Sequence, residues 1–138
     1  MSPQPSCDLG HPPHPRSSTD FLVPYLNDRA LPSLSRHFPP TALQENPYFS
    51  PAVCGSFHYL ASSQKERGLV VWIQYGSVEN LRDDIDKLVK HMREDGVQVD
   101  VDLVEGGVHL DAGIAYALRE RGESSSWVRL IEAVKRYA

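Results

Sequence analysis

The chain has 138 residues, of which 41% are apolar and 23% are charged, and this composition is typical of a single soluble globular domain. Its 14 basic and 18 acidic side chains give a net charge of -4, so it lacks the positive balance of proteins that bind nucleic acid or anionic membranes. No apolar run approaches the roughly 20 residues needed to cross a bilayer, so we expect no membrane span.

The first 18 residues are rich in Pro, Ser and His and almost free of large apolar side chains. Such a segment buries too little surface to offset its ordering entropy, which predicts a disordered tail over residues 1–18. We interpret His11 and His14 as polar residues of this tail rather than as metal ligands. Cys7 and Cys54 belong to no zinc or redox motif, and no signal-peptide core is present, which favours free thiols and a cytoplasmic location.

The folded part is expected to span residues 19–138. A helix should begin at Thr19-Asp20, a pair suited to capping it, and a second short helix should end at Pro39-Pro40. Residues 44–64 contain Asn-Pro, Ser-Pro and Cys-Gly-Ser steps, which are turn formers, so this stretch is predicted to be a loop.

The pattern becomes stronger after Gly68. The unbroken apolar run over residues 69–73 predicts a strand buried on both faces. The next stretch predicts an amphipathic helix that Gly96 closes in a left-handed conformation. The apolar stripe of this helix consists of Leu81, Ile85, Leu88, Val89 and Met92.

Alternating apolar and polar residues over 97–103 predict a second strand, with one face in the core and one in water, that ends at Gly106-Gly107. A helix is expected over residues 111–119. A last helix should follow the serines at 124–126. Its apolar stripe would be formed by Trp127, Leu130, Ile131 and Val134.

The expected order of strand, helix, strand, helix, helix indicates an α/β fold with a short parallel sheet, because strands joined by a helical crossover are parallel. The carboxyl ends of both strands then meet at one edge of the sheet, where ligands bind in such folds. The two loops at this edge carry Glu79 and His109. A histidine acts as a general base when a carboxylate fixes its tautomer, so these two residues are the candidate catalytic pair.

Four stretches in order along the chain resemble the end of the hormone-sensitive-lipase-like esterase and lipase branch of the α/β-hydrolases. They are PYFSP at 47–51, GLVVWIQYGSVENLRDDI at 68–85, GVQV at 96–99 and EGGVH at 105–109. The resemblance covers residues 19–138 and implies a partial α/β-hydrolase domain, with a cap-like helical segment at about 19–45 and a strand and helix core at 68–138. It implies that Glu79 is the acid and His109 the base of a serine-hydrolase triad. Most relatives have Asp at the acid position, and Asp83 and Asp84 are rivals that we interpret as solvated helix charges.

The chain departs from this family because it contains neither GxSxG nor an HGGG-type oxyanion loop. Ser56 and Ser77 are conceivable partners for His109, but neither lies in a strand-turn-helix elbow. The resemblance implies that the chain is the C-terminal part of the domain. A sheet of only two expected strands leaves an apolar strand with an unpaired edge, which favours a fragment or one half of a split protein.

The resemblance implies a carboxylic-ester hydrolase that acts on small hydrophobic esters and needs no cofactor and no metal. The chain would be inactive if no nucleophile is supplied. The alternative is a non-catalytic degenerate hydrolase or an interaction protein that completes a partner's sheet or forms a homo-oligomer. A flavodoxin-like or Rossmann nucleotide module is disfavoured, because the loop at Gly76 lacks GxGxxG.

Overall fold

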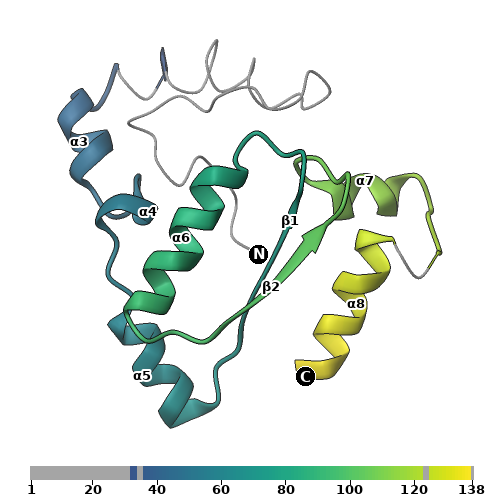
Figure 1. The fold of residues 1–138 in the computed structure, drawn as a ribbon. Coiled ribbons are helices and arrows are strands. Elements are labelled where there is room, and N and C mark those ends of the chain that lie inside the picture. Colours follow the sequence, from purple (N-terminus) through teal and green to yellow (C-terminus); the bar gives the residue numbers. More distant parts are fainter. Residues whose placement is uncertain (1–31, 34–35, 123–124, 138) are drawn as a thin grey trace.

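A computed structural model describes residues 32–33, 36–122 and 125–137 of the chain. The expected tail over residues 1–18 and the expected helix from Thr19 lie outside this part. Over the described residues the fold is mixed α/β, with six helices and a two-stranded parallel sheet (Figure 1). The elements are α3 (Pro40–Glu45), α4 (Pro51–Cys54), α5 (His58–Arg67), β1 (Val71–Gly76), α6 (Arg82–Glu94), β2 (Val99–Val104), α7 (Asp111–Ala117) and α8 (Ser126–Tyr137).

The two strands pair in parallel from Val71 opposite Val99 to Gly76 opposite Val104. This confirms the predicted crossover through α6. The first strand begins later than its apolar run suggested, since Leu69 and Val70 precede β1 and are each 42% exposed. The expectation that this strand is buried on both faces was wrong, because residues 71–74, which alternate between the two faces, are only half-buried.

The core lies between the sheet and α6. Because side chains alternate along a strand, every second residue of each strand faces this helix. Buried residues of the core include Tyr75, Ile85, Val89 and Val99, and the predicted stripe of α6 is buried apart from the half-buried Leu88. Gly96 has φ 86°, so its left-handed conformation after the C-terminus of α6 is confirmed.

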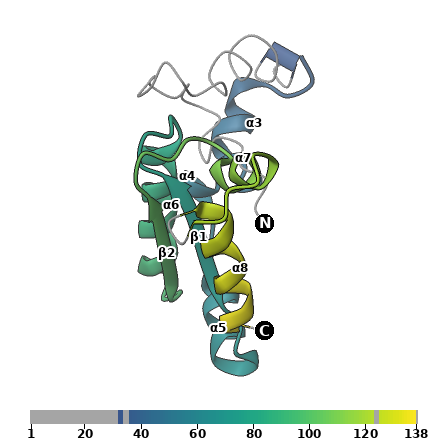
Figure 2. The same cartoon turned by 90° about the vertical axis from the view of Figure 1, so that its right-hand side faces the viewer.

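The opposite face of the sheet contacts α8 (Figure 2), and this contact is polar. Arg129 of α8 pairs with Asp102 of β2, and Tyr137 donates a hydrogen bond to Asp100. The helix α8 therefore lies against the face of β2 that was expected to be exposed to water. The apolar stripe that was expected to pack α8 against the fold is only partly buried: Trp127, Leu130 and Ile131 are half-buried, and Val134 is 58% exposed. The reason is that this stripe lies about a quarter turn around the helix from the residues that contact the sheet.

The prediction of a loop over residues 44–64 was wrong, since this stretch contains the end of α3, all of α4 and most of α5. Pro40, expected to end a helix, begins α3, and Pro51 begins α4. Proline is tolerated at the first helical position because its missing N–H would have no partner there. The helix α5 has no apolar stripe, so periodicity did not reveal it, although Gly68 closes it with φ 66°.

The last two helices meet at one end of the sheet. The rings of Tyr116 in α7 and Trp127 in α8 have centroids 4.6 Å apart, which joins the two helices. The predicted helix over residues 111–119 is confirmed, although it ends at Ala117. Over the described residues, no helix has the length and apolarity required to cross a membrane.

Candidate functional site

Two loops that follow the parallel strands bring the predicted pair together. Nδ1 of His109 lies 2.7 Å from Oε1 of Glu79, although the residues are 30 positions apart. Both side chains are buried, with 1% of Glu79 and 4% of His109 exposed. The expectation that the carboxylate and the imidazole face each other across adjacent strand exits is thus met by the geometry.

The backbone holds these two loops against each other. The N–H of Ser77 donates to the carbonyl of Val104 at 2.9 Å, and the N–H of Val78 donates to the carbonyl of Gly107 at 3.1 Å. A Cβ at Gly76 would come within 2.0 Å of the Gly107 carbonyl oxygen, so this close approach requires glycine. The second oxygen of the Glu79 carboxylate accepts the Gly76 N–H at 3.2 Å, which fixes the carboxylate within its own turn.

Ser77 forms a second link between the loops. Its hydroxyl donates to Oε1 of Glu105 at 3.2 Å and accepts the N–H of Gly106 at 2.8 Å. Arg82 donates to the Ser77 carbonyl at 3.1 Å, so the first turn of α6 is tied to the same point. The Ser77 hydroxyl thus bonds both to a side chain and to the backbone of the neighbouring loop. These two hydrogen bonds hold the loops together and favour a structural role for Ser77 over that of a nucleophile.

The contact determines what the imidazole can do. A carboxylate accepts hydrogen bonds but cannot donate them, so the ring proton belongs on Nδ1 of His109, and Nε2 is the basic nitrogen. Fixing this tautomer prepares the imidazole to take a proton through Nε2, while Glu79 stabilises the imidazolium that results. The arrangement therefore suits general-base chemistry.

The other carboxylates and hydroxyls considered from the sequence lie elsewhere. The interpretation of Asp84 as a solvated charge was wrong, since Asp84 is 8% exposed and pairs with Lys87 at 3.4 Å; it adjoins the apolar stripe of α6. Asp83 is exposed, as expected. Ser56 precedes Phe57, whose N–H donates to Asp95 at the C-terminal end of α6, whereas Glu79 precedes the N-terminal end of this helix.

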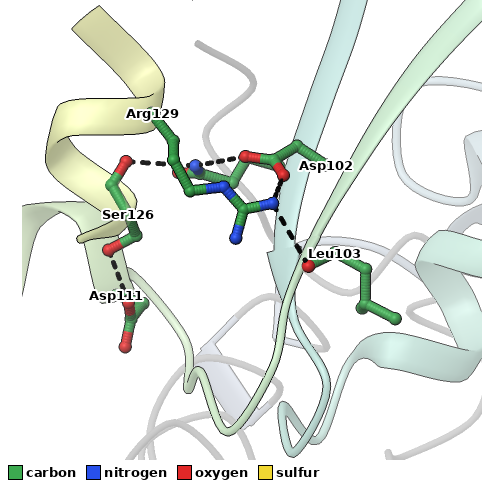
Figure 3. A network of polar contacts seen from close by, with 6 residues as sticks. Asp102, Leu103, Asp111, Ser126 and Arg129 are labelled. Carbon is green, nitrogen blue, oxygen red and sulfur yellow. Dashed lines mark hydrogen bonds and ion pairs between the residues drawn. The ribbon is translucent and has the colours of Figure 1, made fainter. Parts of the chain in front are cut away.

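A polar network that connects α8 to the segment after His109 was not predicted from the sequence (Figure 3). Ser126 donates to Oδ2 of Asp111, two residues after His109, and Asp102 binds both Arg129 and Gln74. The only signal for it was the polar alternation of the second strand, which was interpreted as a solvent-facing side.

Comparisons with known proteins assign the chain to no family: no family model, no curated protein and no solved structure matches it. Across the described residues, no group of three or more His, Cys, Asp or Glu side chains is arranged to hold a metal ion. The geometry of Glu79 and His109 is therefore the main indication of function.

Proposed function

We propose that Glu79 and His109 form the acid and base of a carboxylic-ester hydrolase site in an α/β-hydrolase-type domain. The observation that supports this most is the 2.7 Å contact between the carboxylate and the imidazole. The pair also lies beyond the carboxyl ends of two parallel strands, the edge at which ligands bind in open α/β sheets. The sequence resemblance assigns the same two residues to these roles.

In this reaction His109 removes a proton through Nε2 from the hydroxyl that attacks the ester carbonyl carbon. Glu79 holds the ring and stabilises its positive charge while the tetrahedral intermediate exists. When the bond to the alcohol oxygen breaks, His109 returns the proton to that leaving oxygen. Hydrolysis of an acyl intermediate by water would repeat the two proton transfers.

The proposal requires a nucleophilic hydroxyl supplied by another part of this polypeptide. Two described serine hydroxyls near the site already have other roles: that of Ser77 bridges the two loops, and that of Ser126 donates to Asp111. The sequence contains no GxSxG that would mark the nucleophile. Small hydrophobic esters are the proposed substrates, on the strength of the resemblance.

Hydrolysis of p-nitrophenyl acetate by the purified chain tests this proposal. We expect a rate above buffer that falls by about 10²-fold or more in His109→Gln, because a positioned base contributes roughly 10²–10⁴-fold. Glu79→Gln should also lower the rate while the chain stays folded. His58→Gln, at an exposed histidine near the other end of α6, is the matched control and should retain the activity. A rate equal to buffer, or one unchanged in His109→Gln, would contradict the proposal.

The edge of the sheet at β1, which has no partner strand among the described residues, favours a second candidate function, the completion of a partner's sheet. Within the described residues β1 pairs only with β2, and the half-exposed Leu69 and Val70 lead into it. A strand edge of this kind can accept another extended strand through its backbone hydrogen bonds. Sedimentation velocity should then show association of the chain that Val70→Lys weakens. Equal sedimentation of both proteins as monomers would argue against this function.

A further inference from the structure

The segment that follows His109 holds an uncommon backbone conformation. Leu110 has φ 59°, a left-handed value that a bulky residue adopts at a cost, and its side chain is 57% exposed. Burial of its own side chain therefore does not hold this turn. Neighbouring contacts must fix it, and the next residue, Asp111, provides them.

The carboxylate of Asp111 reaches both sides of the turn. Its Oδ1 lies 3.5 Å from the N–H of Val108, immediately before His109, and its Oδ2 accepts the hydroxyl of Ser126. Ser126 is 1% exposed, so its hydroxyl has little access to water as an alternative partner. Asp111 thus joins the His109 loop to the first residue of α8.

Ser126 is itself fixed to the sheet. Its carbonyl accepts a hydrogen bond from Nε2 of Gln74 at 3.1 Å, and the same nitrogen lies 2.8 Å from Oδ2 of Asp102. The other oxygen of Asp102 pairs with Arg129, one turn further along α8. Figure 3 shows this connected path from the strands through α8 to Asp111.

We propose that Asp111 and Ser126 are positioning residues, which hold His109 in contact with Glu79 by anchoring the His109 turn to α8 and the sheet. Their importance for hydrolysis depends on the proposed function, whereas their effect on the imidazole does not. Neither residue needs to touch a substrate. Loss of either link releases the turn, and His109 separates from Glu79 more often.

The molecule offers a matched control on the same helix. Tyr137 donates from the last turn of α8 to Asp100 of β2, so it also joins this helix to the sheet. Its contact is exposed and has no connection to Asp111. Tyr137→Phe therefore loosens the attachment of α8 without cutting the path to His109, and it separates positioning from a general loss of stability.

Hydrogen exchange of the His109 ring N–H, followed by NMR, tests this directly because it reports how often the contact with Glu79 opens. His109→Gln identifies the resonance. We expect exchange to be roughly tenfold faster in Ser126→Ala, which removes one hydrogen bond, and at least as fast in Asp111→Ala, which removes that bond and the contact with the Val108 N–H. In Tyr137→Phe it should change by less than about twofold. Circular dichroism should show that all three variants remain folded.

Unchanged exchange in Ser126→Ala would overturn the proposal, as would equal acceleration in Tyr137→Phe. Ester hydrolysis is the second measurement. If it falls roughly 10–100-fold in Ser126→Ala through kcat rather than KM, misplacement of the base explains the loss. If the wild-type chain is inactive while exchange still responds to Ser126→Ala, the proposed function fails and the positioning role stands.

Discussion

The two faces of the small sheet are held by different forces, although the same two strands supply both. Toward α6, alternate residues bury an apolar core that includes Ile85 and Val89. Toward α8, the intervening residues form hydrogen bonds and an ion pair, as between Asp102 and Arg129. Hydrophobic burial has no direction, so the α6 face supplies stability, whereas directional polar contacts fix the place of α8 and of the turn beside it.

The largest expected effect lies on the α6 face. Ile85→Ala should lower the free energy of unfolding by about 2–5 kcal/mol, because a residue that is 1% exposed leaves a cavity in the core. Val134→Ala on α8, where the side chain is 58% exposed, should change it by less than about 0.5 kcal/mol. Urea unfolding monitored by circular dichroism measures both, and similar losses would show that the two faces do not differ in this way.

A smaller loss is expected on the α8 face. Arg129→Met removes the cation beside Asp102, whose side chain is only 12% exposed, and should lower the free energy of unfolding by about 1–3 kcal/mol. Lys135→Met, an exposed cation on the same helix, is the control and should have an effect below about 0.5 kcal/mol. Equal effects of the two substitutions in urea unfolding would mean that the ion pair does not hold α8.

The last effect is absent at neutral pH and appears only at high pH, on the α6 face. Burial of Tyr75, together with the hydrogen bond it donates to Asp86, raises the pKa of this phenol from 10.0 to about 12. Below pH 10 both the folded and the unfolded chain keep the proton. Between pH 10 and 12 the unfolded chain loses it first, so the free energy of unfolding should fall as pH rises.

Tyr75→Phe has no phenol proton to lose, so its free energy of unfolding should decline less over this range. Urea unfolding at several pH values between 9 and 12 compares the two proteins, with Tyr59→Phe as an exposed control. Parallel curves for wild type and Tyr75→Phe would contradict the raised pKa.

The sequence predicted the α6 face well and the α8 face poorly, for a physical reason. Four of the five residues of the stripe from Leu81 to Met92 are buried, because hydrophobic periodicity reports the burial of apolar side chains. In α8 the same reasoning selected Trp127 and Val134, whereas Ser126 and Arg129 make the contacts with the sheet and the neighbouring loop. Polar packing leaves no periodic signature, because it depends on partners from other elements.

The candidate site was predictable to the extent that topology determines it. A crossover between parallel strands brings the loops of Glu79 and His109 to one edge, and the residue types then suggest the chemistry. The contribution of Asp111 and Ser126 could not be foreseen, since it requires the strands, α7 and α8 to meet in space. The helices α4 and α5 were missed because short or non-amphipathic helices lack the apolar stripe on which prediction relies.

The tautomer of His109, read from the ¹⁵N chemical shifts of its ring nitrogens at neutral pH, tests the role of Glu79 most directly. We expect Nδ1 to carry the proton in the wild-type chain, and we expect Glu79→Met to abolish this preference while the fold is kept. A proton on Nε2 in the wild-type chain, or the same tautomer in Glu79→Met, would contradict the claim that Glu79 orients His109 as a base.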